Sequence, residues 1–332
     1  LGSLLLEPRW LVDRAGVAAG ASWGNADWIS PALTAPLNSP SVLREGLRAL
    51  ADPAAPLHIP LRADTTLARF LLRFAANCRP GAWHRAGRAN AVLNDEAVET
   101  FDVLVANGVD ALVTDTSVAV AFRDTGHAAA FLKELSHVRT AGQPPLVEML
   151  TGAALREQVP LASSTIATVV NVSGQRFVDP GRFTHALAHA VDDRGGTLRT
   201  GDVVGVSSRP GGVTVTLRTG EPLSADAVVL ATGAWLPALT GRRVRVGLQT
   251  GRGYSFTVPV DRPLPGPIYL PEVRVACTPY RGRLRVAGTM EFRRPSEPLS
   301  RRRIDAIVAA ARRCSTVCAG TSAPTHGWVP GP

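Results

Sequence analysis

Two short turns contain the residues of this sequence that could bind a ligand through small side chains and backbone groups. Residues 227–231 are an unbroken apolar run, which predicts a buried parallel strand, and Ala231 is followed directly by Thr232 and Gly233. A glycine just beyond the carboxyl end of such a strand lets the backbone approach a ligand closely. A buried strand followed by an ordinary turn would explain the same residues equally well.

The other turn follows a short apolar strand, residues 10–12, that ends in Asp13. A carboxylate at the end of the second strand of a dinucleotide-binding fold can accept hydrogen bonds from a ribose. A surface acid that merely ends a strand is the alternative. The next turn contains Gly20, Ala21, Ser22 and Asn25. Its small residues would admit backbone close to a pyrophosphate, to which the Ser22 hydroxyl can donate.

Together these two segments resemble the D-amino-acid oxidase superfamily of FAD-dependent oxidoreductases, and within it the small subunit of D-amino-acid dehydrogenase. The resemblance extends from about residue 10 to about residue 328. It implies FAD as the cofactor, with Val203 pairing the adenine edge and residues 231–233 lying against the phosphates. The cofactor-binding residues that it implies are Asp13, Arg14, Gly20, Ala21, Ser22, Asn25, Val203, Ala231, Thr232 and Gly233.

Residues 251–255, Gly-Arg-Gly-Tyr-Ser, resemble a segment on the substrate sheet of the same enzymes. Tyr254 is therefore expected to contact the substrate carboxylate, although a tyrosine bridging the sheet and solvent fits as well. The superfamily transfers a hydride from the substrate α-carbon to flavin N5, and the imino acid then hydrolyses. The resemblance thus implies oxidative deamination of D-amino acids. A glycine or sarcosine oxidase-like amine oxidase and a non-catalytic remnant are the alternatives.

The two ends of the sequence depart from the family pattern. A strand and a G-x-G-x-x-G turn are expected about 25 residues before the ribose acid, but only twelve residues precede Asp13. The family's C-terminal Arg-Pro pair and Asp-Gly turn would follow Trp328, where the sequence instead reads Val-Pro-Gly-Pro. We therefore expect a chain truncated at both ends, with weakened FAD binding and impaired activity.

The resemblance implies a small amino-acid or amine substrate and an electron acceptor, for which the respiratory chain is one candidate. The net charge of +9 comes almost entirely from scattered arginines, which argues against nucleic acid. The sequence contains no run of 18 apolar residues, so it predicts no transmembrane helix. The family implies a cytoplasmic location, free or peripheral at the inner face of the membrane. No metal is expected, because neither Cys314 with Cys318 nor His185 with His189 has a matching ligand pair.

Apolar periodicity predicts helices over residues 41–50, 65–77, 83–107, 124–142, 151–157, 181–193 and 301–318. Strands are expected over residues 117–122, 169–172, 203–206, 213–217, 227–231, 243–248, 254–258, 273–278 and 284–287. These elements predict an α/β protein in which an FAD-binding Rossmann-like domain, lacking its first βα unit, is interleaved with an α+β substrate domain on a mainly antiparallel sheet. The first domain is assigned residues 1–37 and 160–241, and the second residues 38–159 and 242–332.

Overall fold

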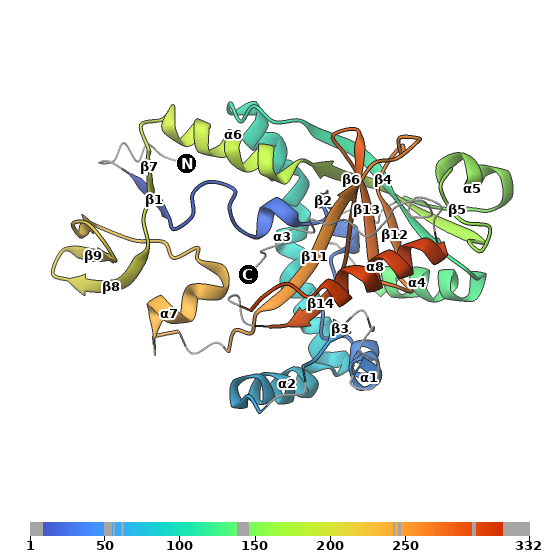
Figure 1. Cartoon of the computed structure of the whole chain (residues 1–332), viewed down its shortest axis with the longest axis horizontal. Helices are drawn as coiled ribbons and strands as arrows, with labels where there is room; N and C mark the ends of the chain where they lie inside the picture. The colour runs from blue at the N-terminus through green and yellow to red at the C-terminus, as the bar shows by residue number, and fades with distance from the viewer. Residues whose placement is uncertain are drawn as a thin grey trace.

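A computed structural model describes residues 9–49, 55, 57–60, 63–137, 146–241, 243–244, 247–293 and 297–314. Its centre is a nine-stranded sheet in the order β11-β14-β13-β12-β4-β6-β2, with β3 beside β14 and β5 beside β6 (Figure 1). The strands are β2 (Trp28–Ile29), β3 (Leu57–His58), β4 (Val113–Phe122), β5 (Val147–Leu150), β6 (Thr168–Val178), β11 (Gly251–Val258), β12 (Ile268–Leu270), β13 (Val275–Tyr280) and β14 (Arg283–Phe292). Parallel pairing joins β12 to β4 and β14 to β3, and the other pairs are antiparallel.

The remaining described strands form two small sheets at one end of the molecule, beside α7 (Leu236–Thr240) (Figure 1). β1 (Trp10–Asp13) runs parallel to β7 (Thr197–Thr200). β8 (Val203–Arg209), β9 (Gly212–Leu217) and β10 (Leu223–Ala225) are antiparallel, and residues 218–222 join the last two.

The other helices are α1 (Pro40–Ala49), α2 (Thr65–Asn77), α3 (Pro80–Ala106), α4 (Thr125–His137), α5 (Gly152–Gln158), α6 (Pro180–Asp192) and α8 (Arg301–Cys314). Their ends follow local sequence signals. Asp64 caps α2 by accepting from the backbone N–H groups of Thr66 and Leu67. After α3, Gly108 adopts φ +90°, the left-handed conformation that glycine allows at a helix end. None of the described helices combines the length and apolarity needed to cross a membrane.

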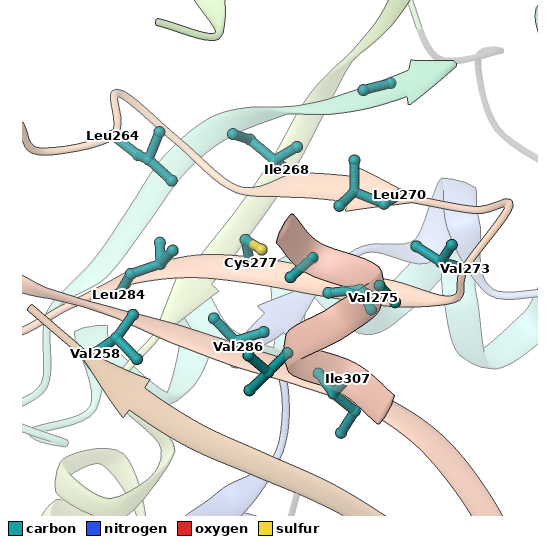
Figure 2. Packing of buried hydrophobic residues seen from close by; sticks show 14 of the residues in the cluster. Val258, Leu264, Ile268, Leu270, Val273, Val275, Cys277, Leu284, Val286 and Ile307 are labelled. Carbon is teal, nitrogen blue, oxygen red and sulfur yellow. The ribbon is translucent and has the colours of Figure 1, made fainter. Parts of the chain in front are cut away.

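The largest core lies between the sheet and α8 (Figure 2). Ile307 from α8 packs on the sheet residues Val275, Leu284 and Val286, all four of them fully buried. Alternation of apolar residues along the strands produces this face, because successive side chains point to opposite sides of a sheet. The observed architecture confirms the mixed α/β class and the mainly antiparallel sheet.

Residues 227–231 do not form the predicted buried strand. The segment is irregular, no described strand pairs with it, and Val229 is 90% exposed. An apolar run becomes a central strand only where strands flank it on both sides, and the described residues supply none here. Residues 243, 244, 247 and 248 likewise form no strand, and the last four residues of the predicted final helix lie outside the described residues.

Two strands of the observed sheet come from segments that the predicted domain division assigns to the FAD-binding unit. β2 and β6 were assigned to the FAD-binding unit, yet both pair within the nine-stranded sheet, β6 directly with β4. A long strand with buried residues along most of its length pairs where both of its apolar faces are covered. One face of β6 packs against α4 and the other belongs to the largest core. The domain boundaries themselves stay a prediction.

Candidate active site

The carboxyl end of β1 brings three of the predicted cofactor-binding residues into one region. Asp13 is exposed, and its Oδ1 accepts hydrogen bonds from the backbone N–H groups of Ala15 and Gly16 at 2.8 and 2.9 Å. Its backbone oxygen accepts from Gly201 N at 2.9 Å, two residues before Val203 begins β8. Parallel pairing of β1 with β7 therefore places Asp13 near Val203, as the prediction requires.

Arg14 connects this region to the turn at residues 231–235. Its guanidinium carbon lies 4.4 Å from the ring centroid of Trp235, within the range of a cation–π interaction. Thr232 is the N-cap and Gly233 the first residue of the 3₁₀ turn η3 (Gly233–Trp235), which ends at this tryptophan. Two predicted ligand-binding segments that lie far apart in the sequence are thus brought together.

This turn leaves a hydroxyl group and a space free for a ligand. Thr232 Oγ1 is buried and has no hydrogen-bond partner among the described residues. Gly233 adopts φ +51°, and no atom lies within 4 Å of where its Cβ would stand. The same open space surrounds Gly20. A buried hydroxyl without a partner is costly unless a ligand or water satisfies it.

The turn at residues 20–25 is held from within and by the sheet. Ala21 and Ser22 are exposed in the 3₁₀ turn η1 (Ala21–Gly24). Asn25 Oδ1 accepts from the backbone N–H of Asp27 at 2.7 Å, so this oxygen shapes the turn itself. Ser255 on β11 donates to the Gly24 carbonyl at 2.7 Å.

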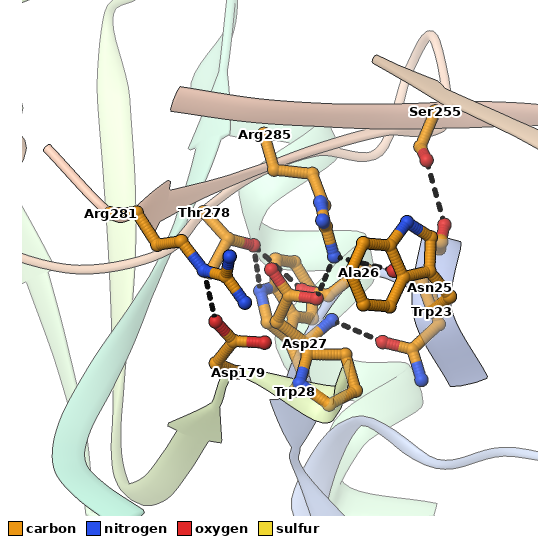
Figure 3. Close-up of polar contacts among 12 residues, drawn as sticks. Trp23, Asn25, Ala26, Asp27, Trp28, Asp179, Ser255, Thr278, Arg281 and Arg285 are labelled. Atoms are coloured by element: carbon orange, nitrogen blue, oxygen red, sulfur yellow. Dashed lines mark hydrogen bonds and ion pairs between the residues drawn. The ribbon is translucent and has the colours of Figure 1, made fainter. Parts of the chain in front are cut away.

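A buried ion pair anchors the end of the same turn (Figure 3). Arg285 Nη1, on β14, lies 2.6 Å from Asp27 Oδ1 and donates to the Trp23 carbonyl at 3.1 Å. Asp27 is 3% exposed and Arg285 5% exposed. Its guanidinium also lies 3.7 Å from the ring centroid of Tyr280. Two distant segments are therefore joined through a polar contact that lies away from solvent.

The ionisation of Asp27 is strongly perturbed. Burial raises its pKa from the ordinary value of 3.8 to about 7, because the charged carboxylate loses its hydration. The charge of Arg285 and its hydrogen bond act in the opposite direction but are outweighed. Asp27 Oδ2 is buried without a hydrogen-bond partner, which is consistent with a costly charged form.

Further contacts around this ion pair fix the loop on the sheet (Figure 3). Thr278 donates to the Ala26 carbonyl and accepts from Trp28 Nε1, both at 2.7 Å. Arg281 Nε donates to Asp179 Oδ2 at 2.5 Å, next to the start of α6. Because these bonds join residues more than 100 positions apart, nothing in the local sequence pattern could reveal them.

Tyr254 is buried and already has polar partners. Its hydroxyl donates to Glu291 Oε1 on β14 and accepts from the backbone N–H of Ser300 at 3.2 Å. Burial, and next the hydrogen bond to Glu291, raise the pKa of Tyr254 above its ordinary value. Glu291 is fully buried, and its Oε2 lies 3.0 Å from Arg293 Nε. A substrate contact for Tyr254 stays a prediction, and it requires the substrate to replace one of these partners.

One group of ligand-type side chains lies elsewhere, on the surface. Asp124, His127 and Glu272 offer ligand atoms within 4.8 Å of one another. Glu272 is already paired with Arg123, and Asp124 Oδ1 accepts from the backbone N–H of His127 at 2.9 Å. These ion pairs and hydrogen bonds account for the cluster without a metal ion.

The chain matches the model of the FAD dependent oxidoreductase family, described as DAO, over residues 10–331. It therefore belongs to this family of FAD-dependent oxidoreductases.

Its curated relatives include D-amino acid dehydrogenases. The enzyme of Chromohalobacter salexigens is 29% identical over 300 residues, which cover 85% of this chain and 70% of that protein. The Cereibacter sphaeroides enzyme is 29% identical over 289 residues, covering 85% and 66%. The chain thus spans about two thirds of the length of these relatives.

Solved structures show the same fold at lower identity. Glycine oxidase from Geobacillus kaustophilus aligns with a TM-score of 0.65 and 18% identity, covering 96% of this chain and 74% of that one. The FAD-bound L-alpha-glycerophosphate oxidase of Mycoplasma pneumoniae aligns with a TM-score of 0.55 and 16% identity, covering 85% and 64%.

The residues near β1 and η3 fit the cofactor of this family. The unpartnered Thr232 hydroxyl and the open space at Gly20 and Gly233 suit a phosphate group, and the exposed Asp13 suits a ribose. Sequence reasoning predicted these residues from their types and from the family resemblance, and their role stays a prediction. It missed Asp27, Arg285 and Glu291, whose only local signal is a charged residue within a largely apolar segment.

Proposed function

We propose that this chain performs the FAD-dependent oxidative deamination of D-amino acids. The observation that supports this most directly is the arrangement of the Gly20–Asn25 turn. One side of the turn belongs to the segment that leads from Asp13, and the other is fastened to the sheet by Arg285 and Ser255. The candidate cofactor segment and the strand of Tyr254 are thereby held together.

Each residue has a defined part in this proposal. Asp13 accepts from the ribose hydroxyl groups, the Thr232 hydroxyl donates to a phosphate oxygen, and the small residues at 20 and 233 admit the backbone. The backbone of Val203 pairs with the adenine edge. Bound FAD would supply the group that accepts the hydride from the substrate α-carbon. The protein positions the substrate and excludes water from the reacting atoms.

Substrate binding would use the polar end of β11. Tyr254 would donate to the substrate carboxylate in exchange for Glu291, and Glu291 would keep its contact with Arg293. The raised pKa of Tyr254 keeps its hydroxyl protonated at neutral pH, so that it can act as a donor.

Flavin titration of two variants tests the cofactor site. Asp13→Asn keeps the oxygen that accepts from Ala15 and Gly16 but replaces the second carboxylate oxygen by an N–H donor. We expect FAD affinity to fall by roughly 10- to 150-fold, equivalent to about 1.5–3 kcal/mol for a hydrogen bond to a charged group. Asp13→Ala should weaken binding at least as much. An unchanged dissociation constant in Asp13→Asn would show that Asp13 does not bind the ribose.

The substrate is tested by comparing D-alanine, glycine and sarcosine with a dye as electron acceptor. We expect D-alanine to be preferred. The similarity of the fold to glycine oxidase favours a glycine or sarcosine oxidase-like activity as the alternative, and preference for sarcosine would establish it. The reduced activity expected from the sequence stays a prediction that the same assay measures. FAD binding without turnover of any of the three would favour the non-catalytic alternative.

A further inference from the structure

A second candidate binding site lies away from the residues assigned to the cofactor, along one face of α2. The cleft there, which we call the α2 cleft, has a volume of about 1180 Å³ and runs between α2 and the segment that precedes β11. Leu37, Phe70, Phe74, Val244 and Leu248 supply its apolar surface. A typical small-molecule pocket measures roughly 300–1,000 Å³, so the cleft has room for an organic ligand.

Helical spacing gives the cleft a positively charged wall. Arg69 and Arg73 are four residues apart on α2, so both guanidinium groups project from the same face. A Cβ at Gly247 would stand 3.4 Å from Arg73 Nη1, which shows that this side chain reaches across the cleft to the opposite segment.

The charge of this wall is uncompensated. Across the described part of the chain, no carboxylate lies within ion-pair distance of Arg69 or Arg73, and the described lining contains no acidic residue. Most other arginines near the sheet are paired, as Arg281 is with Asp179 and Arg285 with Asp27. Two like charges one helical turn apart repel each other, and an anion between them would remove that repulsion.

Aromatic rings provide a surface for the rest of the ligand. Phe70 and Phe74 stack with ring centroids 5.9 Å apart, and Phe70 also meets Phe292 edge-on at 5.4 Å. These contacts fix the rings beside the two guanidinium groups. The amide of Asn38 donates to the Asn77 carbonyl at 2.8 Å. This bond fastens the loop of Leu37 and Asn38, which also lines the cleft, to the end of α2.

We propose that the α2 cleft binds an organic carboxylate with an apolar body. The guanidinium groups of Arg69 and Arg73 donate to the carboxylate, because their planar N–H groups match its two oxygens. The apolar body packs on Phe70, Phe74 and Leu248. This site is separate from the FAD-binding residues, and its ligand binds whether or not the chain turns over an amino acid.

Three naphthalene derivatives with the same ring and different charge test the proposal. Binding of 2-naphthoate, 2-naphthalenemethanol and 2-naphthylmethylamine to the purified chain is followed by their fluorescence, with and without saturating FAD. We expect 2-naphthoate to bind about tenfold or more tightly than the alcohol, since it gains charge-assisted hydrogen bonds, and the ammonium compound to bind most weakly. Added FAD should leave these affinities unchanged.

Variants identify the site. Arg69→Gln and Arg73→Gln should each reduce the preference for 2-naphthoate over the alcohol, and the double variant should abolish it. Arg88→Gln, on the exposed surface of α3 and outside the cleft lining, makes the same change in net charge and should keep the preference. Circular dichroism confirms that each variant is folded.

Several results would overturn the proposal. Equal affinity for the acid and the alcohol would show a merely apolar surface. An unchanged preference in the double variant would place the anion elsewhere, and displacement of 2-naphthoate by FAD would place it in the cofactor site. Competition by inorganic phosphate as effective as that by benzoate would show a general anion site in place of a carboxylate site. None of these outcomes depends on catalytic activity, so they leave the proposed function to its own tests.

Discussion

Substitution of Asp27 by asparagine should change how the stability of this protein depends on pH. The variant keeps an oxygen that can accept from Arg285 Nη1, so the main contact of the buried pair survives. It removes the carboxylate, whose pKa is raised to about 7 in the folded protein. The comparison therefore isolates the effect of ionisation from the effect of shape.

The sign and size follow from proton binding. Between about pH 4 and pH 7 the folded protein keeps the Asp27 proton while the unfolded chain has lost it, so the free energy of unfolding falls as pH rises through this window. A shift of about three pH units corresponds to about 4 kcal/mol over the whole window, at 1.36 kcal/mol per unit. Roughly 2–3 kcal/mol of this falls between pH 5 and pH 8.

Urea unfolding of the wild-type protein and Asp27→Asn at pH 5, 6, 7 and 8 measures this difference. Relative to the wild-type protein, the variant should gain roughly 2–3 kcal/mol of stability between the first and last pH. A difference that is constant with pH would show that Asp27 titrates alike in both states. A difference that changes in the opposite direction would show that Arg285 stabilises the carboxylate more than burial destabilises it.

Three further changes probe the surroundings. Burial raises the pKa of Asp179, but hydrogen bonds from Arg281 and the backbone of residue 182 outweigh it and lower the pKa overall. The stability advantage of the wild-type protein over Asp179→Asn, measured by urea unfolding, should therefore shrink as pH falls below about 4. An advantage that grows at low pH would contradict this. Gly181→Ala would place a Cβ 2.6 Å from the Trp23 ring and should cost about 1–3 kcal/mol, seen as a lower thermal midpoint; an unchanged midpoint would mean that the ring moves freely. Leu284→Ala empties a fully buried position and should cost about 2–5 kcal/mol in urea unfolding, whereas a loss below 1 kcal/mol would show that the core collapses around it.

Local sequence determined most of the helices. The apolar periodicity of residues 65–77 matches α2. The Asp179-Pro180 pair starts α6, with Asp179 Oδ1 accepting from Arg182 N as its cap. Such signals act within one or two helical turns, so they can be read without knowing the rest of the fold.

The strands depended more on their surroundings. Residues 212–217 and 283–292 became strands because partners cover their apolar sides. Residues 227–231 are more apolar still, but no described strand lies beside them. An apolar run indicates that a segment favours burial. Whether another strand lies beside it depends on the rest of the fold. β12, with only three residues, was not predicted, because its pairing with β4 and β13 is what makes so short a segment a strand.

The candidate site shows the same division. The residue types of Asp13, Thr232 and Gly233 indicated a nucleotide-binding region, and the family match agrees with it. The meeting of Asp27 with Arg285, 258 positions apart, and the enclosure of Tyr254 by Glu291 exist only in the folded chain. Sequence thus determined which groups are available for chemistry, and tertiary structure decided which of them are buried together, because burial and pairing depend on contacts between distant segments.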